Sequence, residues 1–65
     1  MFLSRLDRDL IARLMQRLAG TGRPQAVLED FMSVQDETWT GMQRCRERDE
    51  CRDKLVRLGI LKIDA

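Results

Sequence analysis

The chain has 65 residues and a formal net charge of +1, although 35% of its residues are charged. A chain of this length forms one domain, residues 1–65, and buries only about 60% of its unfolded surface, so additional stabilisation by oligomerisation is expected. The nearly balanced charge gives little reason to expect binding to nucleic acid or to an anionic membrane.

The first 14 residues contain no long apolar run, because five charged side chains interrupt them. A secretory signal needs an apolar core of about 7–15 residues and a membrane span needs about 20. We therefore expect neither, and we expect a cytoplasmic protein whose cysteines are reduced.

The first helix is predicted from leucines that recur every three or four positions in the range 3–18. Ser4 followed three residues later by Asp7 forms a box-like cap, and Asp7 as the cap is the competing start. Gly20 is predicted to be the left-handed residue that ends the helix. The loop 21–23 is short, which predicts that the next helix lies antiparallel to the first.

The second helix is predicted to begin with Pro24 in its first turn, where the missing N–H costs nothing. Its apolar face comprises Ala26, Val27, Leu28, Phe31 and Met32. Since glycine inside a helix costs about 1 kcal/mol relative to alanine, we expect a bend between Ser33 and Gly41.

The third helix is predicted to run from about Thr38 to Leu58 and to end at Gly59. Its inner face is assigned to Met42, Cys45, Leu55 and Val56, and a short apolar tail follows with Ile60, Leu61 and Ile63. The expected fold is all-α, a small three-helix domain with helices 1 and 2 as an antiparallel hairpin, a long charged third helix and an apolar C-terminal tail.

The segment 44–54, RCRERDECRDK, is almost wholly charged within this third helix. Pairs three and four residues apart satisfy part of its charge, which is typical of a solvated helix face. A sharper hypothesis starts from Arg48, Asp49 and Arg52, which lie along the expected inner stripe. The two arginines would then dock against carboxylates of a second subunit or of another protein.

Cys45 and Cys51 are about 120° apart around a regular helix and cannot form a disulfide within it. Two thiols in a chain without histidine also fall short of the usual four zinc ligands. Structural cysteines are therefore expected, with a metal site shared by a dimer as the alternative. No resident metal or cofactor is predicted.

Trp39 follows the acidic pair Asp36-Glu37 and lies at the expected bend. Packing in the core is the favoured role for this side chain. If it were exposed beside Met42, it would be a plausible interface anchor, because tryptophan and arginine dominate binding hot spots.

Catalysis is not expected from this sequence. Histidine, the commonest general base, is absent, and no glycine-rich phosphate loop or nucleophile motif is present.

The segment DKLVRLGILKID, residues 53–64, contains a leucine pair, a glycine and an apolar strand. It resembles the end of the recognition helix and the first wing strand of winged-helix DNA-binding domains. The resemblance covers 12 residues and implies that the third helix binds DNA. That helix is nearly charge-balanced, whereas phosphate binding prefers a basic surface, so DNA binding is the alternative expectation.

The function expected first is non-catalytic regulation, in which the chain binds and inhibits or sequesters a larger protein. A winged-helix-like transcription regulator and a structural subunit of an assembly are the alternatives. A homodimer is also expected, because one short neighbour would cover the broad apolar stripe of the first helix incompletely. The residues assigned to partner binding are Trp39, Met42, Arg44, Arg48, Asp49 and Arg52.

Overall fold

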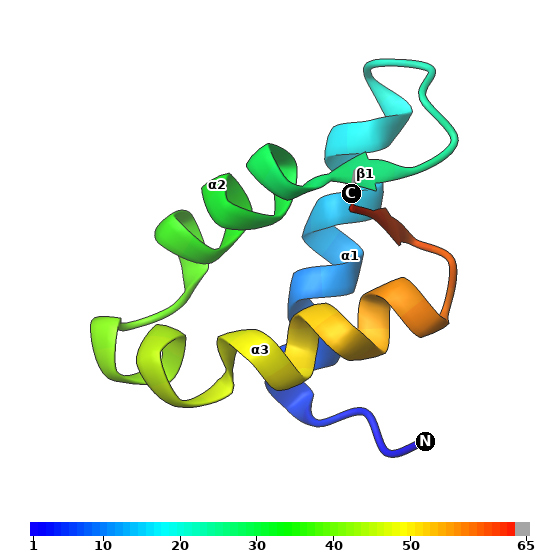
Figure 1. The fold of residues 1–65 in the computed structure, drawn as a ribbon. Coiled ribbons are helices and arrows are strands. Elements are labelled where there is room, and N and C mark those ends of the chain that lie inside the picture. Colours follow the sequence, from blue (N-terminus) through cyan, green and yellow to red (C-terminus); the bar gives the residue numbers. More distant parts are fainter. Residues whose placement is uncertain (64–65) are drawn as a thin grey trace.

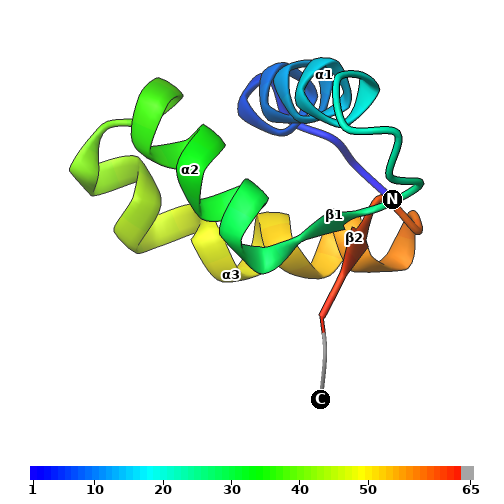
Figure 2. The same cartoon turned by 90° about the horizontal axis from the view of Figure 1, so that it is seen from above.

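A computed structural model describes residues 1–63 of the chain. The structure has three helices and two short strands, in the order α1 (Arg5–Ala19), β1 (Ala26–Val27), α2 (Leu28–Thr38), α3 (Gly41–Arg57) and β2 (Leu61–Lys62). The three helices surround the core, and the two strands lie side by side at one end of it (Figures 1 and 2). The predicted three-helix fold is confirmed, and α1 and α2 pack closely.

Helix α1 begins where the Ser4 cap was predicted. The backbone N–H of Asp7 donates to Ser4 Oγ at 3.2 Å, and the N–H of Ser4 donates to the Asp7 carboxylate at 2.9 Å. The prediction for the other end is wrong, because Gly20 has a right-handed φ of −78°. The left-handed residue is Gly22, with φ of +72°, whose N–H donates to the Leu18 carbonyl.

The start of the second helix was also predicted wrongly. Pro24 precedes the helix, and Ala26–Val27 form strand β1 before α2 begins at Leu28. The N–H of Val27 donates to the Asp30 carboxylate at 3.0 Å, which satisfies a donor at the helix start. Helix α2 then continues through Ser33 to Thr38 without interruption.

The predicted bend lies at Trp39 and Thr40, both in extended conformation. Thr40 caps α3, accepting from the N–H of Gln43 at 3.2 Å while its own N–H donates to the Gln43 side chain. Helix α3 therefore begins at Gly41, three residues later than the Thr38 prediction. It is the longest helix, as predicted, with 17 residues.

The end of α3 was predicted at Gly59, and this is confirmed. Gly59 has φ of +77°, and its N–H donates to the Val56 carbonyl at 3.1 Å. The N–H of Ile60 donates to the Leu55 carbonyl at 3.0 Å, which completes a Schellman motif. The turn sends the chain back along α3 into β2. Asp64 and Ala65, the last residues of the predicted tail, lie outside the described residues.

Strands β1 and β2 pair in parallel, with Ala26 opposite Leu61 and Val27 opposite Lys62. Ala26 and Leu61 are buried, so the pair turns one side chain from each strand into the core. The strand pairing joins the segment between α1 and α2 to the tail after α3. The sequence predicts the apolar tail but not its partner strand.

The core draws on every element of the fold. Its buried apolar residues are Leu10, Leu14 and Leu18 from α1, Ala26 from β1, Phe31 and Val34 from α2, Trp39 from the link between α2 and α3, Cys51 and Leu55 from α3, and Leu61 from β2. The leucines of α1 are thus covered within one chain, whereas Met15 on the same helix is 49% exposed. Little of the apolar stripe of α1 is therefore left uncovered. Incomplete covering of this stripe was the reason for expecting a homodimer.

The inner face assigned to α3 was largely wrong. Leu55 is buried as predicted, but Met42 is 66% exposed, Cys45 is exposed and Val56 is 41% exposed. The second buried residue of the helix is Cys51. Only two apolar side chains of α3 are therefore buried, and half-buried arginines accompany them along the same face.

Candidate partner-binding site

Most of the basic side chains in the charged segment of α3 bond to acceptors within the same chain. Arg44 donates to the Trp39 carbonyl at 3.2 Å and lies 3.6 Å from Asp36. Arg48 donates through Nε to the Gln35 side chain at 3.0 Å. These arginines hold the start of α3 against α2, and both are half-buried.

Two further cations of α3 have carboxylate partners in the same chain. Arg52 lies 3.5 Å from Asp49 and 3.7 Å from Asp53. Lys54 donates to the carboxylate of Asp7 on α1 at 2.8 Å. The predicted docking of Arg48 and Arg52 against carboxylates of a partner stays a prediction, since both have intramolecular partners in this structure.

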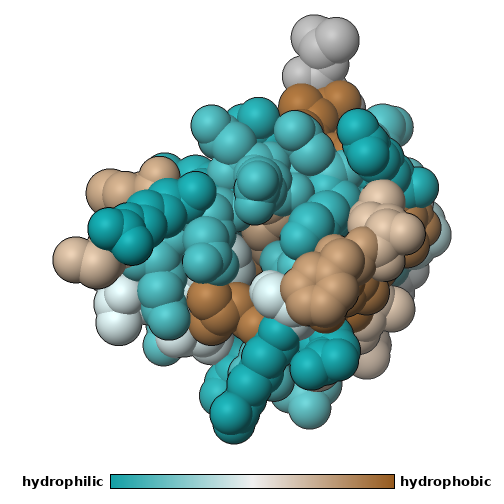
Figure 3. Space-filling view, turned by 90° about the horizontal axis from the view of Figure 1, so that it is seen from below, coloured by the Kyte–Doolittle hydropathy of each residue, from teal (hydrophilic) through white to brown (hydrophobic). Residues whose placement is uncertain are grey.

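The solvent-facing side of α3, which we call the α3 outer face, combines charged and apolar side chains. Its exposed charged residues are Arg46, Asp49, Glu50, Asp53 and Arg57, two basic against three acidic. Its exposed apolar residues are Met42 and Val56. Seen from the side opposite to Figure 2, exposed apolar residues form separate groups among hydrophilic ones (Figure 3). The face therefore lacks the basic surface that a phosphate backbone requires.

Trp39 is only 5% exposed, in agreement with the favoured role in the core. Its indole Nε1 is buried and has no hydrogen-bond partner among the described residues. Buried donors are normally paired, so this one marks a place where an acceptor would be stabilising. The amide nitrogen of Gln35 is the other buried side-chain atom in this condition.

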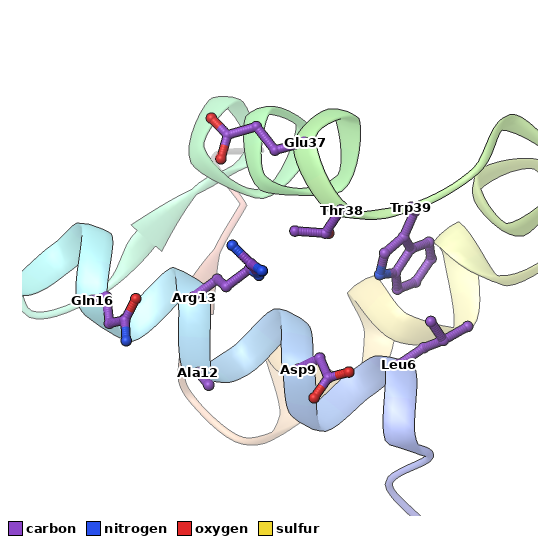
Figure 4. A pocket seen from close by; sticks show the side chains of 8 residues that line it. All are labelled: Leu6, Asp9, Ala12, Arg13, Gln16, Glu37, Thr38 and Trp39. Carbon is purple, nitrogen blue, oxygen red and sulfur yellow. The ribbon is translucent and has the colours of Figure 1, made fainter.

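Trp39 lines a hollow of about 560 Å³ between α1 and the end of α2, which we call the α1–α2 hollow. Figure 4 shows that Arg13 extends from α1 toward α2 and that the indole nitrogen of Trp39 is turned toward the hollow. The other lining residues are Leu6, Asp9, Ala12, Gln16, Glu37 and Thr38. The Arg13 guanidinium thus faces a space that no side chain of residues 1–63 fills, whereas the indole nitrogen has almost no accessible surface.

Two buried carboxylates serve the fold rather than this surface. Asp30 is 4% exposed, and Arg23, the N–H of Val27 and Arg17 lower its pKa to about 2. Asp7 is 3% exposed; burial alone would raise its pKa, but the hydrogen bonds from Lys54 and Ser4 outweigh burial and lower it. Both groups are paired across elements, and neither faces a space that could hold a substrate.

The two cysteines have different environments. Cys51 is 1% exposed, and burial raises the pKa of its thiol to about 12, with the nearby Asp7 adding to the shift. Cys45, predicted on the inner face, is exposed instead. Both thiols are free, and within residues 1–63 no three metal-ligating side chains gather in one place.

The structure therefore divides the predicted site residues into three groups. Met42 and Asp49 belong to the α3 outer face, while Arg44, Arg48 and Arg52 lie beside it with intramolecular bonds, and Trp39 lies in the core. Sequence reasoning missed the α1–α2 hollow and its charged residues Arg13 and Glu37. These two are 24 positions apart, and no local pattern connects them.

No match to this chain was found among models of protein families, curated proteins or solved structures. Within the described part of the chain, none of the helices has the length and apolar composition required to cross a membrane.

Proposed function

We propose that the chain is a non-catalytic regulatory protein that binds and inhibits or sequesters a larger protein through the α3 outer face. The observation that carries this proposal is that most cations of α3 already have partners. Four of its six basic side chains bond to acceptors within the chain, namely Arg44, Arg48, Arg52 and Lys54. The exposed charges that remain favour a protein partner over a phosphate backbone. Met42, at 66% exposed, supplies an apolar contact at one end of the face.

The half-buried arginines have a supporting role in this proposal. Arg44 and Arg48 fix α3 to α2, and therefore set the direction in which Met42 and Asp49 face. Asp49 is exposed, and its pairing with Arg52 at the surface is weak. A basic group on the partner can therefore replace Arg52 at little cost.

The test uses the full chain as bait for a protein partner in a lysate of its source organism, followed by a direct binding measurement with the purified partner. Met42→Asp should weaken binding at least about tenfold, the effect of losing a modest hot spot. Met15→Asp is the matched control, because Met15 is also an exposed methionine but lies on α1. Equal binding by wild type and Met42→Asp would contradict the proposed face.

DNA binding is the second candidate, and the order of the elements favours it. Only Trp39 and Thr40 separate α2 from α3, and strand β2 follows directly after the Gly59 turn. This helix-turn-helix arrangement is consistent with the winged-helix resemblance of residues 53–64. Fluorescence anisotropy with duplex DNA distinguishes the two candidates. DNA binding through phosphates would weaken steeply with salt, whereas the protein-binding proposal predicts no such complex.

The proposal includes self-association as a homodimer and a cytoplasmic location. A cytoplasmic location is consistent with the exposed free thiol of Cys45, which would be oxidised or paired in an oxidising compartment. Self-association would add buried surface to a chain that is short for an independent domain. Light scattering coupled to size-exclusion chromatography measures it directly.

A further inference from the structure

We propose that the α1–α2 hollow is the homodimer contact, in which the Glu37 carboxylate of each copy enters the hollow of the other and pairs with Arg13. This inference rests on the self-association proposed above and assigns it a surface. The α3 outer face remains free in such a dimer, so self-association and partner binding use different parts of the molecule.

The hollow presents a cation that lacks an acceptor. Arg13 has no carboxylate within 4.0 Å among residues 1–63. Leu6 and Ala12 add apolar surface to the lining. A carboxylate is the group that satisfies a guanidinium best, because it accepts charge-assisted hydrogen bonds.

The chain itself carries a suitable carboxylate at the rim of the hollow. Glu37 lines the hollow but forms no ion pair with any cation of residues 1–63. Its carboxylate points away from Arg13 of the same chain (Figure 4). Asp9, the other acidic lining residue, lies 4.0 Å from Arg5, which offsets its charge. Glu37 is exposed at the rim, where a second molecule can meet it.

Two-fold symmetry makes this contact reciprocal. In an isologous dimer, if Arg13 of one copy meets Glu37 of the other, then Glu37 of the first also meets Arg13 of the second. One hollow therefore contributes both a cation and an anion, and the surface is complementary to itself. The two pairs also exclude solvent from the recess around Trp39, which strengthens them relative to exposed pairs.

The experiment measures the dimer dissociation constant of the full chain by analytical ultracentrifugation. Arg13→Glu and Glu37→Arg should each raise this constant at least about tenfold, because each places like charges at both contacts. The double variant Arg13→Glu/Glu37→Arg should restore it to within about threefold of wild type, since its charges are exchanged but complementary. Arg8→Glu and Glu29→Arg, exposed on the same two helices but outside the hollow, are the matched controls.

The outcomes test the proposed surface and self-association separately. A wild type that stays monomeric at about 1 mM overturns both. If the wild type dimerises and neither single charge reversal weakens the dimer, the proposed surface is wrong. The same holds if the double variant remains monomeric although its circular dichroism is native. Trp39, the sole tryptophan, gives a second readout: its emission should change on dilution in wild type and the double variant. In the single variants the change should occur at concentrations at least about tenfold higher. The neutral variants Arg13→Gln and Glu37→Gln repeat the test without charge reversal.

Discussion

Lys54 donates to the carboxylate of Asp7 at 2.8 Å and so joins two residues that are 47 positions apart in the chain. Asp7 also accepts from the N–H of Ser4, so one buried carboxylate both caps α1 and ties its beginning to α3. The Lys54 ammonium lies 5.9 Å from the ring centre of Phe2, which adds a contact from the N-terminal segment. This pair is a direct side-chain hydrogen bond between α1 and α3.

Asp7→Asn should destabilise the fold by about 1–3 kcal/mol, because a buried ionic hydrogen bond is lost and Lys54 keeps no carboxylate there. Chemical denaturation measures the free energy of unfolding. Asp9→Asn is the matched control, since Asp9 is exposed and only 4.0 Å from Arg5, and it should change stability by less than about 0.5 kcal/mol. Equal effects of the two variants would contradict the role assigned to Asp7.

The Asp30 carboxylate predicts how stability depends on pH. Its pKa falls from 3.8 to about 2 in the folded chain, with Arg23 as the largest cause. The folded state therefore binds this proton less readily than the unfolded state. Its contribution is complete above about pH 4 and disappears as the pH falls through 2. With allowance for solvent around the half-exposed Arg17 and Arg23, we expect about 1–2 kcal/mol.

Acid titration of the free energy of unfolding checks this expectation. Asp30→Asn should be less stable than wild type at pH 7, and the difference should shrink as the pH approaches 2. A constant difference over that range would show that the carboxylate acts by its hydrogen bonds alone, without its charge.

The parts of the fold that were predictable are those whose signals are local. The leucine spacing of α1, the Ser4–Asp7 cap and the Gly59 turn each involve residues within a few positions of one another. Strand β1 was missed because two residues cannot display an alternation, and its partner Leu61 is 35 positions from Ala26. A two-residue strand is recognisable only from the tertiary pairing.

The inner face of α3 was misassigned for a different physical reason. The apolar pattern predicts Met42 and Val56 on the inner face, yet Arg48 occupies the half-buried side while they face solvent. An arginine can cover apolar surface with its methylene stem and keep its charged group bonded, here to Gln35. A hydropathy pattern does not register this use of arginine. The α1–α2 hollow was missed for a third reason, since it depends on how two helices are placed.

The two cysteines should differ sharply toward a thiol reagent. Cys51 is buried and its pKa is raised to about 12, so almost no thiolate forms near pH 8. Cys45 is exposed and accessible to the reagent. We expect one thiol per native chain to react rapidly and the second at least about 100-fold more slowly, until denaturant is added. In Cys45→Ser the fast phase should vanish; if it persists, Cys51 is more accessible than the structure indicates.

The glycines at the ends of α1 and α3 differ in backbone conformation, so alanine should have a different effect at each. Gly59 has φ of +77° with open space where a Cβ would lie, so the cost of alanine there is conformational. Gly59→Ala should therefore destabilise the chain by about 1 kcal/mol or slightly more. Gly20, with φ of −78°, already has a right-handed backbone, and an added Cβ would meet only the Arg17 carbonyl at 3.7 Å.

Gly20→Ala should consequently leave stability unchanged or raise it by up to about 1 kcal/mol, because alanine restricts the unfolded chain. Thermal and urea denaturation of the two variants gives the comparison. The opposite order, with Gly20→Ala the more damaging, would mean that Gly20 ends α1 in left-handed conformation. In that case the loop between α1 and β1 would approach β2 by another path, and the pairing of Ala26 with Leu61 would have to change with it.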